Sequence, residues 1–171
     1  LAKFQDVKYS LVPEPQILAL RFLLREYYSI SDMLTELKNR LCTDLYLLFP
    51  GYLDVFSNPF GKSSLKILRN YQTPQAILSE NPGTLAQMIA KTSRKGLIWG
   101  QKKVAKLVDM AYLCLSMPME FSILSHKIQY HLDGIDTFQA NLEGLKVQMS
   151  AMISNVDFPK KVRDSIHLLE D

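Results

Sequence analysis

Basic residues beside the only tryptophan are the clearest chemical feature of this sequence. Between Phe60 and Lys106, nine lysines and arginines occur against one acid, Glu80, so this segment carries a net charge of +8 and the remaining residues sum to −5. Cations next to an aromatic side chain are typical of surfaces that bind a nucleic-acid backbone. The pattern predicts a nucleic-acid-binding surface made of Lys62, Arg69, Lys91, Arg94, Lys95, Trp99, Lys102, Lys103 and Lys106.

These cations also have a simpler interpretation. Lys102, Lys103 and Lys106 follow one another at helical spacing, and lysines at such positions often do no more than solvate the outer face of an amphipathic helix. On this interpretation the basic residues confer solubility and bind no partner. The sequence alone leaves both interpretations open.

The histidines do not predict a metal site. His126 and His131 are five residues apart, which places them on different faces of a helix, whereas a metal-binding pair on one helix is spaced i, i+4. His131 falls among apolar residues at heptad spacing. We expect it to be a buried polar residue that fixes the register of two helices or contacts a partner chain.

Other catalytic signals are missing from the sequence. The acidic pairs Asp133/Asp136 and Glu36/Asp44 are expected on outer helix faces as solvated charges. The chain contains no phosphate-binding loop, dinucleotide-binding fingerprint or nucleophile elbow. We therefore predict no catalytic residue, cofactor or small-molecule substrate for this segment, and a self-contained enzyme is the least favoured class.

The two cysteines and the hydropathy pattern predict the cellular compartment of the protein. Cys42 and Cys114 lie far apart among apolar residues without CxxC spacing, so we expect reduced thiols rather than a disulfide. No run of eighteen apolar residues occurs, and we expect no membrane partner. The chain begins with Leu1 and shows no secretory signal, so we interpret it as part of a longer cytoplasmic protein.

A heptad repeat organises the C-terminal part of the chain. Apolar residues recur there with alternating spacings of three and four, a period that stays buried only when two helices supercoil. The stretch predicts a helix of about 54 Å, which needs a partner helix; Gly134 is expected to face outward on it. The repeat comprises Phe121, Leu124, Ile128, His131, Ile135, Phe138, Leu142, Leu145, Met149, Met152 and Val156.

A second long helix is predicted from Gln16 to Phe49, where no proline or glycine occurs. Its apolar positions include Leu34, Leu41 and Leu45, and its length of about 51 Å matches that of the heptad helix. Two helices of equal length are most simply explained as an antiparallel coiled-coil hairpin. Because the hairpin would leave apolar side chains exposed, we expect two copies to pair into a four-helix dimer.

The residues between the two long helices predict a cluster of short helices at one end of the hairpin. Proline at the first helical position and a capping side chain before it mark two of them, and no strand-like alternation occurs, so the predicted fold is all-α. The expected short elements are a loop over 52–61, helices over 63–71, 74–79 and 82–92, a basic connector over 91–100 that contains Trp99, and a helix over 101–116.

Several short motifs follow one another in the first two thirds of the chain. They are Leu20-Arg21, Leu24-Arg25, Asn39-Arg40-Leu41, Phe49-Pro50-Gly51, Val55-Phe56, Ser64-Leu65-x-x-Leu68 and Tyr71-Gln72-Thr73-Pro74. Their order resembles the middle of the DEDD insertion-sequence transposases, the insertion-sequence one-ten family. The similarity extends over about residues 1–111, although the family usually has proline where this chain has Gln72.

The resemblance implies an internal arm of a mobile-element recombinase. The family's four metal-binding acidic residues belong to a RuvC-like domain, expected before Leu1, and Asp6 does not match their motif. A catalytic serine is expected beyond Asp171. The family's middle part joins these domains, associates subunits and helps to hold DNA and guide RNA, which implies a bacterial, nucleoid-associated protein.

The expected organisation follows from these assignments. The rival interpretation of the whole chain is a coiled-coil protein-interaction module of an adaptor or regulator without a nucleic-acid role. The predicted parts are a tail or linker (1–12), the first coiled-coil helix (13–49), a basic subdomain of short helices (50–117), the second coiled-coil helix (118–156) and a connector to a further domain (157–171).

Overall fold

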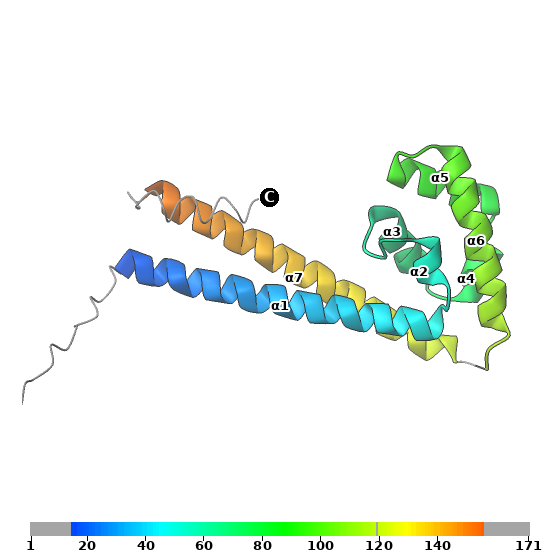
Figure 1. Ribbon diagram of the computed structural model, residues 1–171, viewed down its shortest axis with the longest axis horizontal. Helices are drawn as coiled ribbons and strands as arrows, with labels where there is room; N and C mark the ends of the chain where they lie inside the picture. The colour runs from blue at the N-terminus through cyan, green and yellow to red at the C-terminus, as the bar shows by residue number, and fades with distance from the viewer. Residues whose placement is uncertain (1–14, 119, 156–171) are drawn as a thin grey trace, which may run out of the picture. The chain divides into compact units, whose positions relative to one another are not determined.

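The computed structural model describes residues 15–118 and 120–155 (Figure 1). Every regular element within these ranges is an α-helix, which confirms the all-α prediction. The described residues form two compact units: one combines the residues up to Asp32 with those from Gln139 onward, and the other is Met33–Phe138. Expectations for residues 1–12, Val156 and 157–171 fall outside the described ranges.

Two long helices are present close to where the sequence predicts them. Helix α1 extends over Pro15–Leu48 and helix α7 over Phe121–Asn155. After α1, Gly51 adopts a left-handed conformation with φ of 91°, which glycine reaches without steric cost because it has no Cβ. This turn leads directly into the one-turn helix α2, Tyr52–Val55, in a region predicted as loop.

Within the unit that contains the N-terminal half of α1, the two long helices share an apolar cluster. Leu20 and Met149 are almost fully buried, and Leu24, Tyr27 and Leu145 pack around them. Of the predicted heptad residues in this unit, Met149 is buried, and Leu142 and Leu145 are half-buried.

Within the Met33–Phe138 unit, the seam is wider than a strict heptad. The predicted α1 residues Leu34, Leu41 and Leu45 are buried, and Phe138 is half-buried; the side chain of Leu124 falls outside the described part. Leu132 is also fully buried although it lies beside the predicted repeat, so the apolar face of α7 has the width typical of a helix packed in a globular core. The buried α7 residues in this unit are Phe121, Ile128, His131, Leu132 and Ile135.

Four further helices complete the Met33–Phe138 unit. They are α3 (Lys62–Asn70), α4 (Pro74–Ser79), α5 (Pro82–Ser93) and α6 (Leu97–Leu115). The predicted caps are confirmed: Thr73 Oγ1 accepts a hydrogen bond from the Ala76 amide at 3.1 Å, and Asn81 Oδ1 accepts one from the Gly83 amide at 2.7 Å. Helix α6 packs against α2, α4 and α5, and α3 packs against α5.

The prediction of a basic connector over 91–100 is wrong. Helix α5 continues to Ser93 and α6 begins at Leu97, so Trp99 and Gly100 are helical. The chain turns within three residues because Arg94 adopts a left-handed conformation (φ 58°) and Gly96 a positive φ of 83°. Gly100 allows the two helices to approach closely, since a Cβ there would lie only 2.4 Å from the Ala86 carbonyl oxygen.

Two expectations about outward-facing residues are also wrong. A Cβ on Gly134 would lie 2.7 Å from Leu37 Cδ2, so this glycine faces α1. Asp44 is 5% exposed and forms contacts with Lys127 Nζ at 2.7 Å and His131 Nε2 at 2.8 Å. Burying an unpaired carboxylate costs a large amount of free energy. The two partners from α7 offset this cost for Asp44. Glu36, Asp133 and Asp136 are exposed as expected.

Candidate nucleic-acid interface

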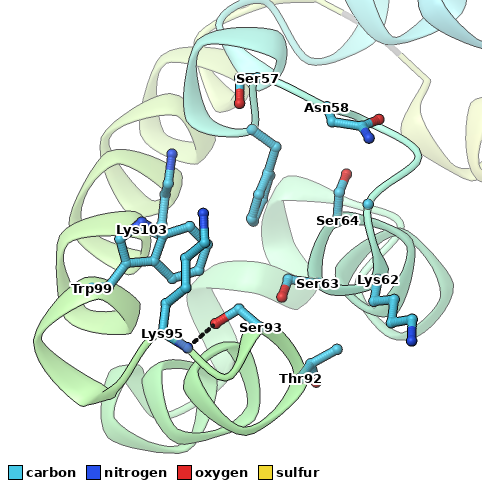
Figure 2. A pocket seen from close by; sticks show the side chains of 12 residues that line it. Ser57, Asn58, Lys62, Ser63, Ser64, Thr92, Ser93, Lys95, Trp99 and Lys103 are labelled. Atoms are coloured by element: carbon cyan, nitrogen blue, oxygen red, sulfur yellow. Dashed lines mark hydrogen bonds between the residues drawn. The ribbon is translucent and has the colours of Figure 1, made fainter.

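A cleft of about 290 Å³ in the Met33–Phe138 unit brings together part of the predicted basic surface (Figure 2). Lys95, Trp99 and Lys103 lie on one side of the cleft, and Lys62 lies with Ser63 and Ser64 on the α3 side. The complete lining comprises Phe56, Ser57, Asn58, Gly61, Lys62, Ser63, Ser64, Thr92, Ser93, Lys95, Trp99 and Lys103. We call this site the Lys–Trp cleft.

The start of α6 positions the aromatic side of the Lys–Trp cleft. Trp99 and Lys103 are four residues apart on α6 and therefore share a helix face. The tight turn through Gly96 places Lys95 beside them. Lys95 Nζ lies 5.0 Å from the centre of the Trp99 ring and Lys103 Nζ lies 5.4 Å from it, distances at which a cation is attracted to an aromatic face.

Lys103 is the most constrained cation of the cleft. Its ammonium group donates a hydrogen bond to the Val55 carbonyl oxygen at the end of α2 and lies 5.7 Å from the centre of the Phe56 ring. Burial lowers the pKa of Lys103, and the positive charges of Lys106 and Lys95 lower it further. The two neighbouring cations act in the same direction as burial because a locally positive potential disfavours the charged form.

The walls of the Lys–Trp cleft are held by hydrogen bonds within the unit. Ser63 Oγ donates to the Ile89 carbonyl oxygen at 3.4 Å, which joins α3 to α5. Ser64 Oγ lies 3.0 Å from the buried Tyr52 hydroxyl, and Ser93 Oγ accepts a hydrogen bond from the Lys95 amide at 3.2 Å. These contacts hold the lining together with the hydrogen bond from the Lys103 ammonium group to the Val55 carbonyl oxygen.

The chemistry of the lining favours an anion. Of the described residues that line the cleft, three are lysines, six carry a hydroxyl or amide side chain, and none is acidic. Phosphate groups are bound by ammonium groups and by neutral hydrogen-bond donors. The two aromatic residues add flat apolar faces, which in nucleic-acid-binding proteins stack with bases.

The other predicted basic residues are not in this cleft. Arg69 forms a two-pronged ion pair with Asp136 at 2.5 and 2.6 Å, so a carboxylate of the protein already neutralises it. Lys91 lines a separate cleft with Lys66, Gln87 and Thr92. Arg94, Lys102 and Lys106 are exposed outside the lining of the Lys–Trp cleft. Sequence reasoning thus identified four members of the cleft and five cations near it.

Sequence reasoning identified Lys62 on the α3 side of the cleft but missed the neutral residues of the lining. Phe56 and Ser64 were noticed only as parts of motifs, and the other serines and the threonine carried no signal of their own. It also missed the buried contact of Asp44 with His131, although Asp44 follows the seam residue Leu41 by three positions. That spacing places Asp44 next to the buried face and could have indicated its burial, although not its partner.

The described residues contain neither a candidate metal-binding group nor a helix suited to cross a membrane. Within residues 15–118 and 120–155, no group of three or more histidine, cysteine, aspartate or glutamate side chains could hold a metal ion. Cys42 is half-buried and Cys114 is buried, and both are free thiols. In the same ranges, no helix has both the length and the apolar character needed to cross a bilayer.

Comparison with known proteins does not assign a family. The chain matches no protein-family model, no curated protein sequence and no solved structure.

Proposed function

We propose that this chain is a non-catalytic helical arm of a DNA recombinase, which binds nucleic acid through the Lys–Trp cleft and associates with further subunits. The observation that carries the proposal is the convergence of Lys62, Lys95 and Lys103 on a cleft that contains Trp99 and no acidic residue among those described. A phosphate group entering the cleft would offset the repulsion between Lys95 and Lys103. The resemblance to insertion-sequence transposases provides the context of transposition.

In this proposal, catalysis is carried out by other domains of the parent protein. A divalent metal would be held by a RuvC-like domain of the parent protein, and the arm would contribute nucleic-acid binding and assembly. DNA and guide RNA are the proposed partners, and the proposed location is the nucleoid of a bacterial cytoplasm.

The test is nucleic-acid binding measured over a series of salt concentrations. A variant with Lys62→Gln, Lys95→Gln and Lys103→Gln should bind DNA and RNA much more weakly, and the slope of log affinity against log salt should fall by about two to three, since each phosphate contact contributes about one. The matched control carries Arg21→Gln, Arg25→Gln and Lys146→Gln, which removes the same charge from the other compact unit. Equal losses in both variants would show that only total charge matters and would contradict the proposal.

Exposed apolar side chains support the proposed self-association. Phe22 and Tyr28 on α1 and Tyr130 on α7 are more than half exposed. Each of the two compact units therefore exposes large apolar side chains that a second chain could cover. Light scattering at micromolar protein concentration should give a mass of at least two chains, and a monomer would contradict this part of the proposal.

The second candidate is a coiled-coil interaction module of an adaptor or regulator. The ion pair between Arg69 and Asp136 favours it, because that predicted DNA contact is instead used within the fold. Exposed Lys102 and Lys106 are also compatible with a solvated helix face. The absence of salt-dependent nucleic-acid binding by the unmodified chain would favour this candidate.

A further inference from the structure

The Lys–Trp cleft contains an aromatic ring that is covered by a movable cation. Trp99 is half-buried in the cleft, and the Lys95 ammonium lies over it at 5.0 Å. Lys95 itself is exposed and belongs to the short turn between α5 and α6. Figure 2 shows its side chain extended along the Trp99 ring. The described lining of the cleft contains no carboxylate that could hold the Lys95 ammonium group in this position.

Lys103 differs from Lys95 in this respect. The Val55 carbonyl oxygen accepts a hydrogen bond from its ammonium, which also lies near the rings of Phe56 and Trp99. Lys103 is therefore fixed in the wall of the cleft, whereas Lys95 can leave the Trp99 ring by side-chain rotation. The two lysines thus have different roles: Lys103 is a fixed positive charge, and Lys95 is an exchangeable cover.

We propose that Trp99 is a stacking platform for an unpaired nucleotide, whose base replaces Lys95 on the ring while Lys95 and Lys103 bind the adjacent phosphate. This inference rests on the proposed nucleic-acid function and assigns its substrate class. The exchange replaces a cation–aromatic contact with a base–aromatic contact and releases the Lys95 ammonium to pair with the phosphate.

The recessed position of Trp99 selects against a regular duplex. A paired base is stacked on both faces by its neighbours and cannot present a face to a side chain inside a cleft. A base in a single strand, loop or bulge can extend into the cleft, and base–aromatic stacking tolerates any base because each has an aromatic face. Unpaired DNA and unpaired RNA share this chemistry.

The chain provides its own probe, because Trp99 is the only tryptophan in the sequence. The experiment titrates the full chain with a short oligothymidylate, an oligouridylate, a blunt-ended duplex of mixed sequence formed from two fully complementary strands, and inorganic pyrophosphate, and records tryptophan fluorescence together with affinity. The single strands should quench the emission, and the duplex and pyrophosphate should not. Quenching by only one of the two single strands would support the inference and identify the source as DNA or RNA.

Two variants at the same position separate stacking from charge. Trp99→Ala should weaken single-strand binding by about 5- to 150-fold, the range for loss of one base stack, and leave duplex binding within about twofold. Trp99→Phe should retain most of the single-strand affinity because it keeps an aromatic face. The unmodified chain tests the inference by fluorescence even if Trp99→Ala does not fold.

Failure of this inference is distinguishable from failure of the proposed function. Salt-dependent binding of single strands without a change in Trp99 emission, or equal quenching by duplex and single strand, would overturn the stacking role while nucleic-acid binding remains. Quenching by pyrophosphate to the same extent as by oligonucleotides would show a phosphate site alone and would also overturn it. No binding of any nucleic acid would contradict both.

Discussion

Asp44 of α1 and His131 of α7 form a buried hydrogen bond of 2.8 Å between carboxylate Oδ2 and imidazole Nε2. Each residue is 5% exposed, and Lys127 Nζ lies 2.7 Å from the other carboxylate oxygen. Because a carboxylate accepts, His131 donates through Nε2. Its Nδ1 is buried without a hydrogen-bond partner among the described residues. This contact joins the segments of α1 and α7 that belong to the Met33–Phe138 unit.

The first prediction concerns this contact. Asp44→Ala should lower the free energy of unfolding by about 3 kcal/mol, the lower end of the range for breaking a buried ion pair, because half-exposed Lys127 can turn to water. A double-mutant cycle with His131→Ala, followed by urea denaturation, should give a coupling energy above about 0.5 kcal/mol. Asp133→Ala, which removes an exposed carboxylate from α7, is the control. Additive losses at Asp44 and His131 would show that the hydrogen bond does not couple them.

The second prediction compares two helical glycines. Gly100→Ala should lower the free energy of unfolding by about 1 to 3 kcal/mol, as overpacking does, because the new Cβ would meet the Ala86 carbonyl oxygen at 2.4 Å and separate α5 from α6. Gly144→Ala should raise it by about 0.5 to 1 kcal/mol, since nothing lies within 4 Å of its Cβ position. Thermal melts of both variants measure the difference. Stabilisation by Gly100→Ala would exclude the close approach of the two helices.

The third prediction concerns the two thiols. Cys114 is fully buried, and burial raises the pKa of its thiol. Cys42 is half-buried, and burial raises its pKa as well. The thiolate is the reactive form, and a reagent must also reach it. Cys42 should therefore react with a disulfide reagent in the folded protein, whereas Cys114 should react only when the protein unfolds. Cys42→Ser should remove the early reaction and Cys114→Ser should not; the reverse pattern would show that α6 leaves Cys114 accessible.

The fourth prediction concerns Tyr52 and alkaline pH. Its buried hydroxyl donates to the Ser64 carbonyl oxygen at 3.0 Å, and burial raises the pKa of Tyr52 above its ordinary value of 10.0. Above that pH the unfolded chain loses the tyrosine proton while the folded chain keeps it, so this contribution to stability is complete below pH 10 and is lost as the pH rises.

Comparison of the unmodified chain with Tyr52→Phe tests this contribution. The variant should be less stable by about 1 kcal/mol near neutral pH, because it lacks the hydrogen bond. The difference in unfolding free energy should shrink as the pH rises above 10. A constant difference over this range would show that Tyr52 ionises equally in both states.

The fifth prediction distinguishes two basic residues that the sequence placed in one surface. Lys103 lines the Lys–Trp cleft, whereas Arg69 is paired with Asp136 outside it. Lys103→Gln should reduce the salt slope of nucleic-acid binding by about one, and Arg69→Gln should leave it nearly unchanged. Both substitutions remove one positive charge, so each controls for the other. Equal effects would place Arg69 on the binding surface.

Local patterns were sufficient to predict the helices. The heptad spacing of α7, the uninterrupted apolar periodicity of α1 and the caps at Thr73 and Asn81 all act within about four residues along the chain, which is the range of helical contacts. These signals predicted the all-α fold and most helix boundaries. They failed between α5 and α6, where a basic, glycine-containing stretch forms a three-residue turn and then a helix. Gly100 lies close against Ala86 of α5 there, and a contact between helices is not visible in local spacing.

The tertiary structure alone decided which charged residues are used within the fold. Nothing in the spacing of Asp44, Lys127 and His131 shows that residues more than eighty positions apart pair in a buried contact. The sequence likewise grouped nine residues as one basic surface, and only the packing of α3, α5 and α6 brings Lys62, Lys95, Trp99 and Lys103 into one cleft and directs Arg69 to Asp136. Helix formation depends on neighbours in sequence, whereas a binding site depends on the relative positions of helices, and these are set by side-chain packing.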